Sequence, residues 1–252
     1  MAERIVLIGR RGVATAAIHD VLARKYIVEV IVERAPDRWR LLKGRIRRNG
    51  LRTVIGQVLF QALMVPVLRR SSSMRRAKIL EEMGGTKGLP KEAEEVASVN
   101  APATIALVRE RAPAIVVING TRIMKPATLA AISVPVLNMH VGITPRYRGV
   151  HGAYWALVEQ DPDHCGVTVH LVDEGIDTGG ILEQGLVHPT AEDNFTTYPL
   201  LQLQTGLPLL SAAIDRVLKG DRTTRPGPDG DRRWYHPTLW QYVRYRFGRG
   251  VR

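Results

Sequence analysis

Cysteine is almost absent from this sequence, because Cys165 is the single cysteine among 252 residues. An intrachain disulfide is therefore impossible, and we expect a reducing cytoplasm as the setting. Aromatic residues are also scarce, at 6%, but a hydrophobic fraction of 45% is ordinary for a soluble globular chain. No basic leader precedes an apolar run near the start, so we expect no signal peptide. No cluster of His, Cys and Asp has metal-ligand spacing, so we expect no metal.

Acidic residues are missing from one long segment, and this accounts for most of the net charge of +12. Between Asp37 and Arg76 the chain carries ten arginines and one lysine, and Asp37 is the only acid. The remaining chain is close to electrically balanced. A uniformly basic chain would favour nucleic acid as a partner, whereas a single basic segment indicates one local basic surface.

The order of the predicted elements indicates an α/β fold. Residues 4–9 form a short apolar run, a helical pattern extends over 13–25, and residues 27–33 alternate with many β-branched side chains. Strand, glycine turn, helix and strand are the opening of a doubly wound sheet. Further strands are predicted at 114–121, 134–140, 165–172 and 181–189. We therefore predict a doubly wound, mostly parallel sheet with a Rossmann-like N-terminal half and a helical insertion.

We expect one domain at residues 1–190, which contains a basic helical insertion at 37–88. The C-terminal part, 191–252, is expected to place a helix and a basic aromatic tail on the same domain. Within the insertion, residues 53–68 are sixteen mostly apolar residues at helical spacing, too few to span a bilayer. Pro66 is expected to break or end this helix.

Two interpretations of the insertion remain open. The favoured one is a helix packed on its own sheet or on a second subunit, which would make the protein a homodimer. The other is an interfacial helix, with arginines on both flanks, that contacts anionic lipid at the inner membrane face through residues 37–76.

The first turn reads Gly9-Arg10-Arg11-Gly12 and lacks the third glycine of the dinucleotide fingerprint. A nicotinamide cofactor is therefore not favoured. The backbone N–H groups and the two arginines could bind a substrate phosphate. A plain turn with solvated arginines is the alternative.

Three polar residues lie where predicted strands end in loops. Asn138 and His140 are two positions apart, so on an extended strand their side chains point to the same side. Asp177 lies in the loop Asp173–Gly180. Ligands of open parallel sheets bind outside the carboxyl ends of the strands, where these residues fall. Taken singly, each residue is more often structural or part of a turn.

The stretch that contains them resembles the folate-dependent formyltransferase family, which includes glycinamide ribonucleotide transformylase, methionyl-tRNA formyltransferase and the amino-sugar N-formyltransferases. The resemblance is carried, in order, by Val116–Met124, Leu137–Gly149, Gly166–His170 and Asp173–Gly180. It covers residues 95–190 well, the first 35 residues loosely and 37–88 hardly at all. It implies transfer of a formyl group from 10-formyltetrahydrofolate to a primary amine, without a metal.

The resemblance assigns roles residue by residue. Asn138, His140 and Asp177 match the family's catalytic residues, and His170 falls where the transformylases also carry a histidine. The two loops expected to bracket the pterin contain Arg122, Ile123, Met124, Val172, Gly175 and Ile176. Asn138 is expected to donate to the formyl oxygen, His140 to stabilise its negative charge, and Asp177 to orient His140 and raise its pKa. One departure from the family pattern is Val141-Gly-Ile-Thr-Pro145, which borders the acceptor.

The acceptor implied by elimination is an amino sugar linked to a nucleotide diphosphate. Only about 60 residues follow the matching region, too few for the barrel domain of methionyl-tRNA formyltransferase, and no regulatory domain like that of formyltetrahydrofolate hydrolase precedes it. Glycinamide ribonucleotide, methionyl-tRNA and a non-catalytic binding module at a membrane or nucleic-acid surface remain as alternatives. The candidates for acceptor contact, besides Gly9, Arg10, Arg11 and His170, are Tyr147, Arg148, Tyr154 and Trp155, although the last two also begin a helix and are equally interpreted as core.

Overall fold

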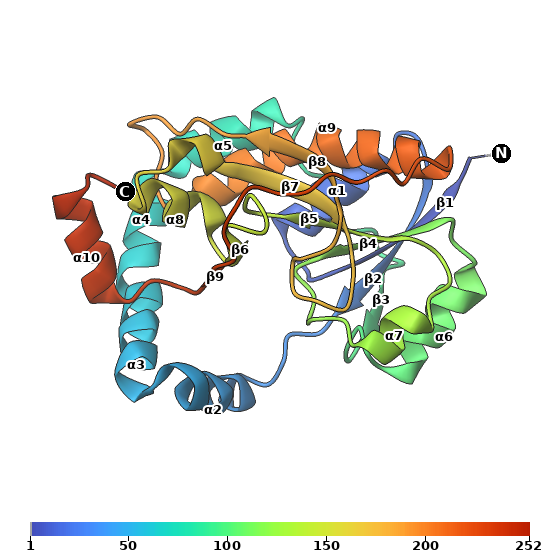
Figure 1. Ribbon diagram of the computed structural model, residues 1–252, viewed down its shortest axis with the longest axis horizontal. Coiled ribbons are helices and arrows are strands. Elements are labelled where there is room, and N and C mark those ends of the chain that lie inside the picture. The colour runs from blue at the N-terminus through green and yellow to red at the C-terminus, as the bar shows by residue number, and fades with distance from the viewer. Residues whose placement is uncertain (1) are drawn as a thin grey trace.

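A seven-stranded sheet in the order β3-β2-β1-β4-β5-β7-β8 forms the centre of the protein (Figure 1). The computed structural model describes residues 2–252. The first five strands in this order are mutually parallel, while β7 and β8 run antiparallel to their neighbours. The predicted doubly wound, mostly parallel α/β sheet is therefore confirmed. The strands are β1 (Arg4–Gly9), β2 (Ile27–Glu33), β3 (Glu94–Val96), β4 (Ile115–Asn119), β5 (Val136–His140), β7 (Gly166–Leu171) and β8 (Ile181–Leu186).

Helices cover both faces of this sheet. The side chains of each strand alternate between the two faces, so one sheet contributes to two hydrophobic cores. Ile5 and Leu7 of β1 pack in one cluster with residues of α1 and α9, while Val6 and Ile8 pack on the other face with α6. Successive side chains of a strand point to opposite faces, so a continuously apolar strand is buried on both. The helices of these two layers are α1 (Val13–Leu22), α5 (Ser73–Glu82), α9 (Tyr198–Leu218), α6 (Pro102–Arg111) and α7 (Pro126–Ala130).

A third, aromatic core joins the predicted insertion to the C-terminal tail. Phe60, fully buried, has its ring centroid 4.8 Å from that of Phe195 and 4.9 Å from that of Tyr242. Trp155 stacks on Trp234 with centroids 4.6 Å apart. The C-terminal part thus packs against the same body as the insertion. This core involves α8 (Gly152–Val158), α10 (Leu239–Gly248), the short helix η2 (Pro162–His164) nearby, and a two-stranded sheet of β6 (Arg148–Gly149) and β9 (Arg233–Trp234).

The predicted insertion is helical, but Pro66 does not end its apolar helix. After α2 (Arg38–Asn49), helical structure continues from α3 (Leu51–Leu59) through a π turn, η1 (Phe60–Met64), into α4 (Val65–Ser71). The N–H of Val65 donates to the Phe60 carbonyl five residues earlier. This wider turn directly before Pro66 relieves the clash of the proline ring with the preceding turn. The expectation that Pro66 breaks or ends the helix was wrong.

The helix is consequently longer than the sequence suggested. Residues Leu51–Ser71 form 21 helical residues. An 18-residue stretch within them has a mean hydropathy of 1.6, and 22% of that stretch is buried in the protein. By length and composition this helix could cross a membrane, so the estimate of too few residues was also wrong. It is the one such helix in the part of the chain that the structure describes. One such helix is weak support for a membrane-spanning segment, and its packing decides the matter.

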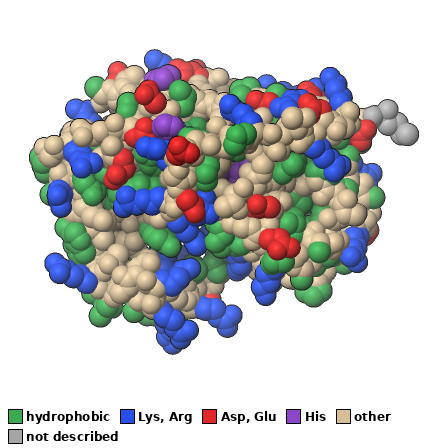
Figure 2. All heavy atoms as spheres, viewed as in Figure 1, with side chains coloured by type: hydrophobic (Ala, Val, Ile, Leu, Met, Phe, Trp, Pro, Cys, Tyr) green, Lys and Arg blue, Asp and Glu red, His purple; other side chains and the backbone are tan. Residues whose placement is uncertain are grey.

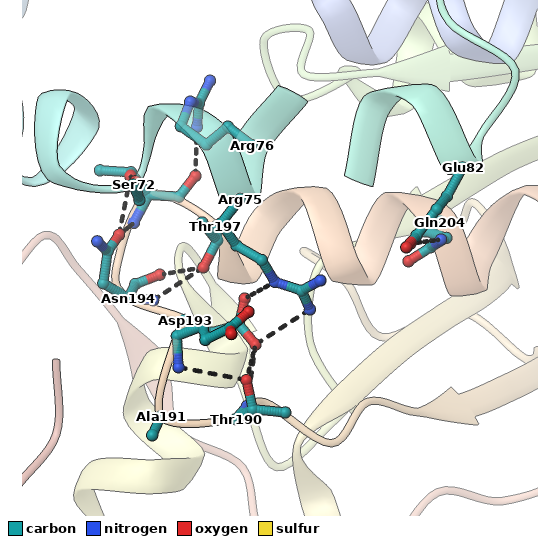
Figure 3. Close-up of polar contacts among 12 residues, drawn as sticks. Ser72, Arg75, Arg76, Glu82, Thr190, Ala191, Asp193, Asn194, Thr197 and Gln204 are labelled. Atoms are coloured by element: carbon teal, nitrogen blue, oxygen red, sulfur yellow. Dashed lines mark hydrogen bonds and ion pairs between the residues drawn. The ribbon is translucent and has the colours of Figure 1, made fainter. Parts of the chain in front are cut away.

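Polar contacts fix the end of this helix to the start of α9 (Figure 3). The guanidinium of Arg75 reaches both carboxylate oxygens of Asp193, at 3.0 and 3.3 Å, and the Asp193 side chain is fully buried. Ser72 Oγ lies 3.1 Å from the hydroxyl of Thr196, and Arg76 donates to the Thr196 carbonyl. The junction of α4 and α5 is thereby held on the segment that precedes α9.

Replacing Asp193 with Ala should destabilise the protein by about 1–3 kcal/mol, because it leaves the partly exposed guanidinium of Arg75 and the N–H of Thr190 without their acceptor. Burial opposes ionisation of Asp193, but hydrogen bonds from Arg75 and Thr190 outweigh it and lower the pKa of this carboxyl. A lowered folded-state pKa stabilises the fold above about pH 4, and the stabilisation is lost as pH falls through the folded-state value. Urea unfolding at pH 7 and pH 3 should therefore show a loss that shrinks at the lower pH. The exposed control Asp163→Ala should unfold like the wild type at both.

Candidate functional site

A cavity of about 480 Å³ lies at the carboxyl ends of β4 and β5. Its walls are the loop 120–124 after β4, the residues 138–141 around the end of β5, the loop 172–177 after β7 and the tail segment 233–236. Strand order reverses between β1 and β4, and ligands of open α/β sheets bind at such switch points. The loops of several strands and the C-terminal tail thus meet around one space.

Asn138 and His170 lie opposite each other on the antiparallel strands β5 and β7. Nδ2 of Asn138 is 3.2 Å from Nε2 of His170, and Nδ1 of His170 is 2.7 Å from the carbonyl oxygen of Leu171. Burial lowers the pKa of His170, which favours the neutral ring. A neutral ring that donates from Nδ1 to Leu171 accepts at Nε2 from the Asn138 amide. His170 therefore orients this amide, whose second N–H can serve a ligand.

His140 has both ring nitrogens directed at oxygen atoms. Nδ1 is 3.3 Å from Oδ1 of Asp177, and Nε2 is 3.1 Å from the carbonyl oxygen of Tyr147. Only the protonated ring can donate to both. Burial favours the neutral form, but the charge and hydrogen bond of Asp177 outweigh it and raise the pKa of His140. The side chain lines the cavity, so Asp177 favours a positive charge in the cavity wall.

Asp177 is held in place by the loop around it. Its backbone is left-handed, with φ 54°, and its Oδ2 accepts a hydrogen bond from the N–H of Gly149 at 3.2 Å. Burial opposes ionisation, but the charge of His140 and these hydrogen bonds lower the pKa of Asp177 to about 2. Arg148 donates to the carbonyl of Ile176 at 3.0 Å and so ties the same loop to β6. The carboxylate is ionised throughout the neutral range.

The other wall, residues 120–124, depends on a buried carboxylate that the sequence did not single out. Glu33, at the end of β2, accepts from the backbone N–H of Arg122 at 2.8 Å and of Val99 at 2.7 Å. The Arg122 guanidinium lies 2.8 Å from the same carboxylate. Asn100 accepts from the N–H of Lys125 and donates to the carbonyl of Ile123. The loop is therefore built before any ligand binds.

All the residues predicted for catalysis and for the cofactor line this one cavity. They are Asn138, His140 and Asp177, together with Arg122, Ile123, Met124, Val172, Gly175 and Ile176. Of the residues predicted for the acceptor, Arg10 and His170 also line it. The pattern of polar residues at predicted strand ends thus indicated side chains that the fold places around one cavity.

The remaining acceptor candidates lie outside the cavity lining. Tyr154 and Trp155 are 1% and 5% exposed and belong to the aromatic core, as the alternative interpretation held. Tyr147 is buried and donates its hydroxyl to Asp161 at 2.8 Å. Arg11 donates to Glu95 at 2.9 Å. Arg148 pairs with Asp231, and a Cβ on Gly9 would meet Thr15 Oγ1 at 2.6 Å.

Sequence reasoning missed the part of the site that comes from the tail. Strand β9 pairs with β6, Arg148 opposite Arg233 and Gly149 opposite Trp234, and this brings Arg233–His236 into the cavity wall. A Cβ on Gly149, whose φ is 94°, would meet the Trp234 carbonyl oxygen at 2.3 Å. The aromatic and arginine content of the tail was the one signal in the sequence that this segment binds something. The local sequence does not indicate that the tail pairs with β6.

Comparison with known proteins agrees with this site. The family profile described as formyl transferase matches residues 60–201, more than half of the chain. The chain belongs to the formyl transferase family. The match begins inside the segment predicted as an insertion, so the second half of that segment is part of what the family shares.

Curated relatives of this formyl transferase include a methionyl-tRNA formyltransferase from Thermodesulfovibrio yellowstonii, 37% identical over 90 residues, 36% of this chain and 29% of the relative. The chain spans less than a third of that relative and 38% of the next, from a Synechococcus species. The fold is shared with a sugar N-formyltransferase from Shewanella sp FDAARGOS_354, at a TM-score of 0.58 and 15% identity, covering 92% of this chain and 76% of the other.

Two further solved formyl transferases share the fold. Glycinamide ribonucleotide transformylase 1 from Symbiobacterium toebii superposes with a TM-score of 0.58 at 21% identity, covering 91% of this chain and 95% of the other. The formyltransferase PseJ from Anoxybacillus kamchatkensis, in complex with UDP-4,6-dideoxy-4-formamido-L-AltNAc and tetrahydrofolate, gives 0.53 at 18% identity, covering 97% and 90%. At these identities the likeness concerns the fold.

Replacing Asp177 with Asn should lower the pKa of the His140 imidazole below its ordinary value of about 6.5. In the wild type the carboxylate raises this pKa, and without it burial and the charge of Arg148 remain, both of which lower it. The ring should then lose its proton at a lower pH than in the wild type. NMR titration of labelled histidine side chains measures this directly. The exposed Glu174→Gln in the same loop is the control, and an unchanged His140 titration in Asp177→Asn would refute the assigned pair.

Proposed function

We propose that this protein transfers a formyl group from 10-formyltetrahydrofolate to the primary amine of a small molecule. The observation that carries the proposal is the convergence of Asn138, His140 and Asp177 on one cavity. The two loops that the family resemblance assigns to the pterin form walls of that cavity. Tetrahydrofolate in the PseJ complex supports folate as the donor.

The residues present suit a flat, polar heterocycle. The loop 120–124 and the loop 172–177 contribute apolar side chains, among them Met124, Val172 and Ile176, together with backbone N–H and C=O groups. Apolar walls with a few fixed polar groups are the usual character of a site for a small aromatic ligand. When bound, the folate supplies an activated formyl group, and the protein supplies position and charge.

The side chains divide the chemistry among them. The Asn138 amide, oriented by His170, donates to the formyl oxygen as that oxygen gains negative charge. The imidazolium of His140 adds a positive charge beside it, and the ionised Asp177 maintains that imidazolium. As the amine nitrogen forms its bond to the formyl carbon, it loses a proton, which Asp177 accepts through water. The bond from carbon to the folate nitrogen then breaks, and the same proton passes from Asp177 through water to that nitrogen.

For the acceptor we propose a nucleotide-linked amino sugar. Arg10, Arg45 and Arg233 line the cavity, and among the described residues none of the three forms an ion pair. Guanidinium groups of this kind suit a diphosphate. Tyr235, which is 39% exposed, lines the same wall and can stack on a base or sugar. These residues take the place of Tyr154 and Trp155 as candidates for acceptor contact.

Two further candidate acceptors also carry a primary amine. They are glycinamide ribonucleotide, from the name of the solved transformylase, and methionyl-tRNA, from the name of the curated relatives. Glycinamide ribonucleotide also presents a phosphate to the arginines. We place the reaction in the cytoplasm, which suits the single thiol of Cys165, buried and free. A panel of the three amines, each offered with 10-formyltetrahydrofolate, distinguishes them by release of tetrahydrofolate.

Substituting Asn138, His140 or Asp177 with Ala should each slow formyl transfer by about 10²–10⁴-fold, since each removes charge stabilisation or proton transfer. Tetrahydrofolate release under single-turnover conditions measures the step, and circular dichroism confirms the fold. The exposed Asp163→Ala serves as control and should retain full activity. Near-normal turnover in all three variants would end the mechanism.

Replacing Glu33 with Gln should raise the KM for 10-formyltetrahydrofolate about tenfold, because the loop 120–124 loses a charge-assisted anchor. Turnover at saturating folate should change little, since Asn138, His140 and Asp177 are untouched. Glu95→Gln is the matched control, because Glu95 is exposed and contacts Arg11 and Arg34 instead. A fall in kcat with an unchanged KM would contradict this assignment.

A further inference from the structure

The helix 51–71 has two apolar faces, and the protein covers only one of them. Val54 and Phe60 are buried against the body, and Gln57 donates to the His236 carbonyl at 2.8 Å. The opposite side carries a stripe of exposed apolar residues at helical spacing. These residues, here called the outer stripe, are Leu51, Ile55, Val58, Leu59, Leu63 and Val67, with exposures from 38% to 59%.

Exposed basic residues flank the outer stripe along the chain, in α2, in the first turn of α3 and at the end of α4. Among the described residues they form no ion pairs, and no acid occurs between residues 38 and 76. Figure 2 shows Lys and Arg side chains gathered along the lower edge of the molecule, over α2 and the adjoining end of α3. The basic set, here called the basic rim, consists of Arg38, Arg40, Lys43, Arg47, Arg48, Arg52, Arg69 and Arg70.

We propose that the outer stripe and the basic rim bind the surface of an anionic phospholipid bilayer. Apolar side chains on one helical face, with arginines around them, are the pattern of a helix that lies in the plane of the interface. The arginines and Lys43 are attracted to acidic headgroups, while the stripe enters the boundary between headgroups and acyl chains. This inference is independent of the proposed reaction, because it uses no residue of the catalytic trio.

The helix binds the surface and does not cross the bilayer, although its length and the mean hydropathy of 1.6 of an 18-residue stretch within it would permit crossing. Its inner face is committed to the protein through Phe60 and the Gln57 hydrogen bond, and the Arg75–Asp193 ion pair of the following helix, α5, fixes its end (Figure 3). Trp240 of α10 also packs against Gly56, where a Cβ would meet the indole at 2.3 Å. Crossing would require all of these contacts to be broken.

Charge complementarity favours lipid over a second copy of this chain. A two-fold dimer places the same patch on both sides of its interface, so the basic rim of one copy would face that of the other. With no acid between residues 38 and 76, each copy brings only positive charge to the contact. RNA would satisfy the arginines, but it offers nothing apolar to the outer stripe. An anionic bilayer satisfies both at once.

The test is co-sedimentation of the full chain with vesicles of equal parts phosphatidylglycerol and phosphatidylcholine, compared with phosphatidylcholine alone. We expect binding to the anionic vesicles, weakened in high salt. The double variant Leu59→Asp/Leu63→Asp should reduce binding at least about tenfold, because it buries charge where apolar groups entered. The double variant Arg47→Glu/Arg48→Glu should do the same through charge, at about tenfold or more.

Matched controls distinguish the contribution of the outer stripe and the basic rim from the general effect of a surface substitution. Leu186→Asp, at an exposed apolar position of β8, and Arg222→Glu, at an exposed basic position, should bind like the wild type. Asn138→Ala should also bind normally, and every surface variant should keep its circular dichroism spectrum and its rate with soluble amines. A failure of the membrane proposal can thereby be distinguished from a failure of the proposed reaction.

Three results would overturn the proposal. The first is no sedimentation with anionic vesicles at low salt. The second is a dimer in analytical ultracentrifugation that Leu59→Asp/Leu63→Asp dissociates, without vesicle binding, which would assign the stripe to a second copy. The third is binding of transfer RNA that Arg47→Glu/Arg48→Glu abolishes and the stripe variant leaves intact, again without vesicle binding.

Discussion

A buried ion pair, His140 with Asp177, is the contact around which the candidate site is arranged. Each partner would be unfavourable alone, because burial disfavours both charges. Together they require support from several elements: β5 supplies the imidazole, the loop after β7 supplies the carboxylate, and Gly149 of β6 donates to it. The need to satisfy that carboxylate explains why three distant stretches of chain meet at one point, and the same meeting encloses the cavity.

The position of Asn138, His140 and Asp177 at strand ends could be predicted because it depends on local sequence patterns. Asn138 and His140 lie two apart on a strand, and an open parallel sheet directs the ends of such strands to one edge. Asp177 lies in a glycine-rich loop next to a strand. The sheet could be predicted for the same reason, since β1, β2 and β4 are short apolar runs separated by helical patterns. Family resemblance then assigned roles that periodicity alone could not.

What could not be predicted depends on contacts between distant residues. Glu33 is an ordinary strand-end acid in the sequence, and its burial follows only from the position of the loop 120–124 beside β2. The pairing of β9 with β6 involves two residues on each strand, too few for a detectable alternation. Tyr154 and Trp155 satisfy the pattern of both a core helix and a sugar platform, and only packing distinguishes the two. The π turn before Pro66 likewise has no signature in composition.

The pairing of β6 with β9 has a consequence for how the site is assembled. Since Arg233–His236 form one wall of the cavity, every strand of the central sheet is synthesised before the residues that complete the pocket. Completion of the site therefore waits until residues 233–236 have been synthesised and β9 has paired with β6. Proteolytic removal of that tail would leave the trio in place in a cleft open to water.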